Sequence, residues 1–277
     1  MTEALKRQFS PSAIAGAFVE ARRLAQALAA YPGVRPTTLA EAYAVQDAAI
    51  ALWPDAVAGW KIGLVPPDQR AAVGADRIAG PIFTRQVQHA ARAGVADLPV
   101  IRGGFSAVEA EFVFRIGADA PTDRRAWTPI DAAALPLDLH IGVECAGSPL
   151  AAINDLGAAV TASDFGNNAG LVVGQAIPDW RKRAWSELTA QTFIDDVEVG
   201  AGAAAALPGG PFSALAFILE HAAARGRPLR AGQWISTGAV TGVHRIAVGQ
   251  RARCVFDRLG EVSCRMVEAV AGAGAAA

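Results

Sequence analysis

The sequence predicts an α+β fold in which a small N-terminal helical region precedes a mixed β core. Residues 1–56 carry two helix patterns, and the chain then changes to short apolar runs separated by Gly and Pro. After residue 56, helical patterns are too few to cross over between many parallel strands, which favours antiparallel or mixed sheets. We therefore expect a helical cap over residues 1–56, a β-rich domain over residues 57–270 and a flexible tail over residues 271–277.

The two N-terminal helices have recognisable start and stop signals. Ser10 and Pro11 are typical of an N-cap and a first-turn proline, and apolar residues then recur at helical spacing until Tyr31. Residues 38–41 form a capping box that begins a second helix, which Pro54 ends.

Eight short segments with strand patterns follow, and the clearest later helix covers residues 213–224. The predicted strands are residues 57–64, 107–116, 137–145, 170–174, 195–199, 233–238, 251–257 and 261–267. The last two are expected to form a hairpin.

Composition excludes several classes of protein. The chain has 277 residues, 52% of them hydrophobic, so it can bury a sizeable core. Its 25 basic and 26 acidic residues give a net charge of −1, which does not favour a nucleic-acid partner. Three cysteines without a CxxC pair argue against disulfides and structural zinc and suit a reducing cytoplasm.

Membrane and targeting segments are also not expected. No segment approaches the ~18 consecutive apolar residues of a membrane-spanning helix. The apolar run at residues 13–19 is cut short by Glu20 and the arginines that follow, so an amphipathic helix is favoured over a signal peptide. We expect a cytoplasmic protein.

Two apparent motifs are rejected. Residues 200–205 match GxGxxA, but the Pro and Gly residues at 208–211 leave no room for the helix that a dinucleotide site requires. The four histidines lack metal-ligand spacing, and no GxSxG nucleophile motif occurs.

Three glutamates stand on the polar rows of otherwise apolar strands. Glu109 and Glu111 project from the same strand face, roughly 7 Å apart along the strand. This pair alone is more typical of a solvated strand face than of a metal site. Glu144 ends the polar row of the 137–145 strand and joins the pair if the two strands are neighbours. Three carboxylates without a thiolate suit a hard divalent cation such as Mg²⁺ or Mn²⁺.

At this point the sequence resembles a known family. The run from Gly59 to Gly63, GWKIG, is similar to the GxKIG element of the 2-keto-4-pentenoate hydratases, in the fumarylacetoacetate hydrolase superfamily. Residues 38–46 resemble the second helix of these proteins, residues 108–111 their ExE metal strand, and residues 236–239 a later signature. The resemblance covers about residues 35–267, and the order of the motifs makes it specific.

The resemblance implies a fold and a set of ligands. It implies a mixed β-roll core of the fumarylacetoacetate hydrolase C-terminal-domain type over residues 57–270. It also implies that Glu109, Glu111 and Glu144 hold Mg²⁺ or Mn²⁺, which chelates the carboxylate and 2-oxo (or enol) oxygen of the substrate.

Further roles follow from the same resemblance. Lys61 is the expected acid/base or carboxylate-orienting group, and Asp76 is a candidate for proton transfer. Ser236 and Thr237 are candidates for holding the substrate carboxylate.

The activity implied is that of a metal-dependent hydratase, a lyase that adds water to a 2-hydroxy-2,4-dienoate in aromatic meta-cleavage catabolism. The sister 4-oxalocrotonate-type decarboxylase is an alternative, as is a non-catalytic oxo-acid-binding or partner subunit. Assembly into a homo-oligomer is expected, and a complex with a sister enzyme of the pathway is conceivable.

The sequence departs from the family pattern at two places near the expected pocket. Typical members follow the third glutamate with a Val-Asp-Ser-Arg-like run, whereas residues 145–149 read CAGSP. They follow KIG with Leu-Thr-Ser, whereas residues 64–67 read LVPP. Hydrolysis of the type that uses a Glu–His pair is disfavoured, because no histidine lies between Lys61 and His89.

Overall fold

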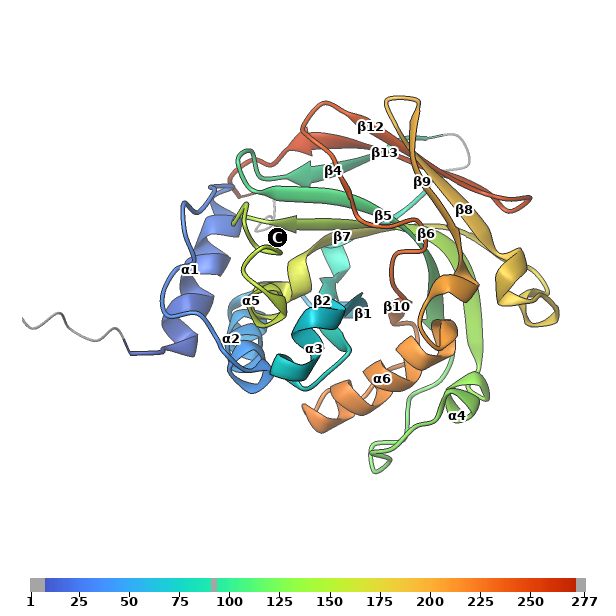
Figure 1. Cartoon of the computed structure of the whole chain (residues 1–277), viewed down its shortest axis with the longest axis horizontal. Helices are drawn as coiled ribbons and strands as arrows, with labels where there is room; N and C mark the ends of the chain where they lie inside the picture. The colour runs from blue at the N-terminus through green and yellow to red at the C-terminus, as the bar shows by residue number, and fades with distance from the viewer. Residues whose placement is uncertain (1–7, 91–93, 273–277) are drawn as a thin grey trace, which may run out of the picture.

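The computed structural model describes residues 8–90 and 94–272, and it has the predicted α+β architecture. Two curved β-sheets lie one above the other, and the helices gather around the larger sheet (Figure 1). The helices are α1 (Pro11–Arg23), α2 (Leu39–Leu52), α3 (Pro67–Val73), α4 (Pro129–Ala133), α5 (Ala158–Ser163) and α6 (Gly210–Ala224).

The larger sheet has the strand order β2-β1-β10-β5-β6-β7-β3, and β11 also pairs with β5. Its strands are β1 (Val57–Leu64), β2 (Arg77–Phe83), β3 (Val87–His89), β5 (Phe105–Ile116), β6 (Leu137–Ser148), β7 (Asn168–Ala176), β10 (Trp234–Ser236) and β11 (His244–Arg245). The sheet is mixed: β1 runs parallel to β10 and β3 runs parallel to β7, while the other pairs are antiparallel.

The smaller sheet has the order β4-β13-β12-β8-β9. Its strands are β4 (Ala96–Val100), β8 (Thr189–Ile194), β9 (Val197–Ala203), β12 (Arg251–Phe256) and β13 (Gly260–Glu268). The predicted hairpin of the last two strands is present.

Alternation along β5 gives the two faces of the larger sheet different environments. Phe112 faces the smaller sheet, where its ring centroid lies 5.4 Å from that of Phe256. On the other face, Val113 packs in one cluster with Ile82 of β2 and Leu171 of β7. The larger sheet is therefore rolled, because β2 and β7 stand far apart in the strand order yet meet in this cluster. The odd-numbered residues of β5 point into the roll.

Some local predictions hold and others are wrong. The predicted strand 57–64 coincides with β1, and the capping box of α2 forms between Thr38 and Glu41. The first helix ends at Arg23 instead of continuing to Tyr31, because Ala25 adopts a left-handed conformation with φ of 53°.

The predicted strand 195–199 is confirmed in part, because residues 197–199 lie in β9. Its predicted start is wrong: Asp195 and Asp196 form the turn between β8 and β9, with φ of 47° and 64°. Aspartate tolerates this left-handed conformation, which two-residue hairpin turns require, so the strand begins two residues later than predicted.

The remaining sequence expectations have mixed outcomes. Residues 200–203 lie in β9, so no helix begins at the GxGxxA match. The three cysteines are buried and free. Within residues 8–90 and 94–272, no helix has the length and apolar character needed to cross a bilayer. The division at residue 56 stays a prediction, and most of the predicted tail, residues 273–277, lies outside the described residues.

Candidate metal centre

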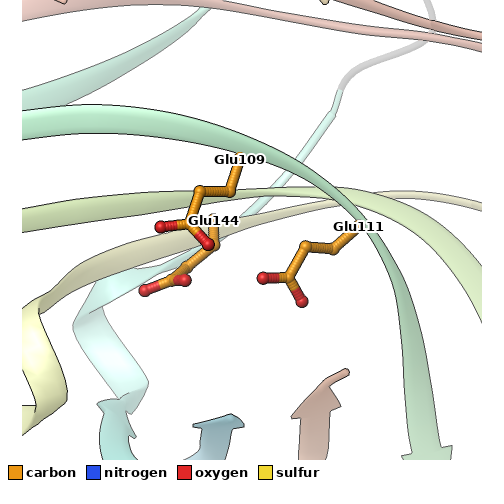
Figure 2. A group of neighbouring side chains, drawn as sticks. All are labelled: Glu109, Glu111 and Glu144. Atoms are coloured by element: carbon orange, nitrogen blue, oxygen red, sulfur yellow. The ribbon is translucent and has the colours of Figure 1, made fainter. Parts of the chain in front are cut away.

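The three glutamates predicted as metal ligands meet inside the roll of the larger sheet. The antiparallel register of β5 and β6 places Glu109 directly opposite Glu144, and Glu111 follows two residues along β5. One carboxylate oxygen from each residue lies within 4.8 Å of the others, and all three side chains extend toward the same side of the strands (Figure 2). Glu109 is 6% exposed, and the other two are fully buried.

Neighbouring groups orient two of these carboxylates and leave one oxygen of each without a hydrogen bond. Glu111 Oε2 accepts hydrogen bonds from Ser236 Oγ at 2.5 Å and from the backbone N–H of Gly238 at 2.8 Å. Glu144 Oε1 accepts a hydrogen bond of 2.9 Å from Asn168 Nδ2. Glu111 Oε1 and Glu144 Oε2 are buried and accept no hydrogen bond.

The electrostatics of the cluster call for a cation. Burial, followed by the charges of Glu144 and Glu109, raises the pKa of Glu111 well above its ordinary value. Burial raises the pKa of Glu144 to about 7, although Lys61 opposes the shift. Buried carboxylates that repel one another are stabilised by a divalent ion, and an all-oxygen donor set in which two oxygens accept no hydrogen bond fits Mg²⁺ or Mn²⁺.

Lys61 lies beside this cluster on β1. Its side chain is buried, and Nζ lies 3.3 Å from Glu144 Oε2. Burial by itself lowers the pKa of Lys61, but Glu144, Glu109 and Glu111 together outweigh it and raise the pKa above the ordinary value. Lys61 is therefore an ammonium group at neutral pH in the metal-free cluster.

A cavity of about 370 Å³ opens beside Lys61 and Glu109. One part of its wall is apolar, formed by side chains of β1, β2 and α5 such as Ile62, Leu64 and Ile78. The other polar residues that line it are Gln69, Asn154, Thr161 and Asn167. The cavity is thus charged at one end, where Lys61 and Glu109 line it, and apolar or lined by neutral polar side chains elsewhere.

Three other residues singled out in the sequence do not line this cavity. Ser236 is buried and its hydroxyl contacts Glu111, while the hydroxyl of Thr237 donates to the carbonyl of Phe112 at 2.7 Å. Asp76 has a side chain that is 54% exposed and paired with Arg77 at 2.7 Å. Their roles in substrate binding and proton transfer stay predictions.

The start of β7 and the residue before it supply site residues that the sequence did not indicate. Asn168 contacts Glu144, and its neighbour Asn167 lines the cavity. The only local signal was two consecutive amides after Gly166, a pattern that is also typical of an ordinary turn.

A buried ion pair connects α1 to the same segment. Arg22 makes two 2.8 Å hydrogen bonds to Asp164 and also donates to the carbonyls of Gly147 and Asn168. Ser148 Oγ donates to the second oxygen of Asp164 at 2.6 Å. The end of β6 lacks the Val-Asp-Ser-Arg-like run that typical family members have there. Arg22 and Asp164, from other parts of the chain, nevertheless place an arginine and an aspartate beside Gly147 and Ser148.

Comparison by sequence gives limited matches. No family model matches this chain. A segment of 71 residues is 39% identical to 4-oxalocrotonate decarboxylase of Pseudomonas putida, and the match covers 26% of this chain and 26% of the decarboxylase. The chain thus aligns with about a quarter of the length of this curated relative.

Comparison by structure covers nearly the whole chain. The 4-oxalocrotonate decarboxylase of Pseudomonas putida G7, complexed with magnesium and adipate, is similar with a TM-score of 0.76 and 20% identity, over 95% of this chain and 100% of the other. Fumarylpyruvate hydrolase from Pseudomonas aeruginosa, in complex with Mn²⁺ and pyruvate, is similar with a TM-score of 0.54 and 17% identity, over 78% and 91%. The fold implied by the resemblance to the 2-keto-4-pentenoate hydratase and 4-oxalocrotonate decarboxylase family is confirmed, because the chain shares the overall fold of these solved structures.

Proposed function

We propose that this protein is a divalent-metal-dependent lyase, a hydratase that adds water to a 2-hydroxy-2,4-dienoate. The observation that carries the proposal is the buried trio of Glu109, Glu111 and Glu144 with Lys61 beside it, since Glu109 and Lys61 also line a cavity. Structural neighbours with the same fold were crystallised with magnesium and with Mn²⁺, which supports the choice of metal.

The chemistry divides between the cation and the chain. A bound Mg²⁺ or Mn²⁺ would act as a Lewis acid toward the carboxylate and 2-oxo oxygen of the substrate. Lys61 lies beside the cluster, where its ammonium form would attract the anionic substrate and could protonate a carbon of the dienol while the enol oxygen loses its proton. Ser236 and Gly238 keep Glu111 in its ligating orientation, and Asn168 does the same for Glu144.

Decarboxylation of a 4-oxalocrotonate-type acid is the second candidate. The local match to the Pseudomonas putida decarboxylase and the similarity to its structure favour it. In either reaction a cation held by Glu109, Glu111 and Glu144 would stabilise negative charge that develops on the 2-oxo oxygen, so the trio alone is compatible with both. Assembly as a homo-oligomer, association with a sister enzyme and a cytoplasmic location are part of the proposal and rest on the family resemblance.

One experiment tests the activity and separates the two reactions. The protein is stripped with EDTA, reloaded with Mg²⁺ or Mn²⁺, and incubated with 2-hydroxypenta-2,4-dienoate or with 2-oxo-3-hexenedioate. Loss of dienoate absorbance without CO₂ release supports the hydratase, and CO₂ release from the hexenedioate supports the decarboxylase. No metal-dependent turnover of either compound would overturn the proposal.

Matched variants locate the activity at the cluster. Glu109→Gln and Glu144→Gln are expected to abolish Mn²⁺ binding measured by calorimetry. Glu20→Gln changes a glutamate whose side chain is 60% exposed, and it should bind Mn²⁺ as the unchanged protein does.

A further inference from the structure

The loop of residues 237–243, between β10 and β11, makes a backbone hydrogen bond to one of the candidate metal ligands. The N–H of Gly238 donates to Glu111 Oε2 at 2.8 Å, and the N–H of Val240 donates to the carbonyl of Ala110 at 2.9 Å. The other carboxylate oxygen of Glu111, Oε1, is buried and has no hydrogen-bond partner. The position of the 237–243 loop therefore affects the orientation in which Glu111 offers that oxygen to a cation.

A buried pair of hydroxyl groups connects this loop to the smaller sheet. Thr241 Oγ1 lies 2.8 Å from Oγ1 of Thr192 on β8, and both residues are buried. His244 Nε2 donates to the carbonyl of Thr241 at 2.8 Å, and His244 is itself paired with Val108 of β5. Because a buried hydroxyl that loses its partner costs free energy, the pair holds the loop in place against β8.

The edge strand β9 contacts the same loop through two glycines. Gly200 and Gly202 are the glycines of the GxGxxA match. A Cβ added at Gly202 would overlap the carbonyl oxygen of Val240, and one added at Gly200 would overlap the carbonyl oxygen of Thr241 and the ring of His244. Only a residue without a side chain lets two backbone segments lie this close, so these glycines serve packing against the loop.

From these contacts, and given the proposed function, we propose that Thr241 is a positioning residue for the metal centre. Its hydroxyl pair with Thr192 fixes the loop so that the N–H of Gly238 stays on Glu111. Thr241 does not line the cavity, and it acts through Gly238. A carboxylate that is already held in its ligating orientation binds a cation more tightly than one that must be ordered when the cation binds.

Two variants of Thr241 test this role. Thr241→Val keeps the shape of the side chain and removes the hydroxyl, so Mn²⁺ affinity measured by calorimetry should fall by about fivefold or more. Thr241→Ser keeps the hydroxyl, so its Mn²⁺ affinity should stay within about twofold of that of the unchanged protein. The EPR spectrum of bound Mn²⁺ reports the arrangement of its ligands. It should change in Thr241→Val and not in Thr241→Ser, whereas a loss of stability alone would not alter it.

A substitution in β9 tests the same contact sterically. In Gly202→Ala the new methyl group should displace the loop and lower Mn²⁺ affinity by about tenfold. Ala201→Val enlarges the neighbouring residue of β9, which is exposed, and should bind Mn²⁺ as the unchanged protein does. If Gly202→Ala does not fold, the Thr241 variants decide the test, because they preserve the packing against β9.

A second measurement requires no metal. In protein stripped with EDTA, the exchange of the Gly238 amide proton with solvent is followed by NMR. Exchange should be about tenfold faster in Thr241→Val, because the loop opens more readily when the hydroxyl pair is lost. Thr241→Ser and Ala201→Val should leave the exchange rate unchanged.

The outcomes separate this inference from the proposed function. If Thr241→Val binds Mn²⁺ as tightly as the unchanged protein, the positioning role is overturned and the metal-dependent function stands. If Thr241→Val and Thr241→Ser lose affinity equally, the hydroxyl pair is not the cause and the inference is again overturned. If the unchanged protein binds no Mn²⁺, the proposed function fails, and the exchange of Gly238 still decides whether Thr241 positions the loop.

Discussion

Lys61 Nζ lies 3.3 Å from Glu144 Oε2, so the ammonium group and one of the candidate metal ligands form a buried ion pair. β1 and β6 are not adjacent in the larger sheet, because β10 and β5 stand between them. The contact therefore depends on the roll of the sheet, which turns both side chains toward a common interior. It places the amino group of Lys61 next to the cluster of candidate metal ligands.

Replacement of this lysine should separate catalysis from metal binding. If Lys61 is the proton donor that we propose, Lys61→Met is expected to lower turnover by about 100-fold or more. Affinity for Mn²⁺ should not fall, because the ammonium group repels a cation at the cluster. Steady-state kinetics and calorimetry measure the two effects. Lys182→Met, which changes a lysine with a side chain 78% exposed, is the control. Full activity in Lys61→Met would contradict the assigned role.

The buried pair of Arg22 and Asp164 should dominate the attachment of α1. Arg22→Met leaves Asp164 charged, buried and short of a counter-ion, so the free energy of unfolding should fall by about 3–5 kcal/mol. Arg102→Met breaks an exposed pair with Glu268 and should cost less than about 1 kcal/mol. Urea titrations measure the free energy of unfolding of both variants. Equal decreases would contradict a larger contribution from the buried Arg22–Asp164 pair.

Two glycines should respond in opposite ways to the same substitution. In Gly80→Ala the new methyl group would meet the carbonyl of Phe165, and the free energy of unfolding should fall by about 3 kcal/mol or more, because backbone cannot easily move away. Gly16→Ala lies within α1 with no atom within 4 Å of the new Cβ, so stability should rise by about 0.5–1 kcal/mol. Thermal unfolding of the two variants measures both changes in stability. Unchanged stability in Gly80→Ala would contradict the close approach of the Phe165 carbonyl to Gly80.

Acid should destabilise the protein through His221. Burial, followed by the positive charge of Arg225, lowers the pKa of His221 to about 4, and its Nε2 lies 3.2 Å from Arg225 Nη1. Above pH ~6.5 the ring is neutral in both states and contributes nothing. As the pH falls from about 6.5 to about 4, the unfolded chain binds a proton that the folded protein excludes, and stability falls by up to about 3 kcal/mol.

The measurement is the difference between two curves of unfolding free energy against pH. His221→Gln keeps an acceptor near Arg225 and does not titrate, so its stability should decline less steeply between pH 6.5 and 4. His89→Gln, which changes an exposed histidine of β3, should follow the unchanged protein. Parallel curves for His221→Gln and the unchanged protein would contradict the shifted pKa.

The sequence predicted those parts of the molecule that depend on local periodicity. Alternation along β5 and β6 placed Glu109, Glu111 and Glu144 on polar rows, and the capping box at Thr38 predicted where α2 begins. It did not predict β2, because Gly80 and Pro81 interrupt its apolar run and read as a turn. Gly80 is there because another segment of backbone passes close to it.

The sequence by itself determined the fold class and the three carboxylates, since strand alternation and helix caps involve residues only a few positions apart. Tertiary structure alone decided what surrounds those carboxylates. Asn168 reaches Glu144 across 24 positions, Ser236 reaches Glu111 across 125, and Arg22 reaches Asp164 across 142. No local pattern records such distant pairings, because they arise only when the rolled sheet and α1 bring these segments together and exclude water from the groups they bury.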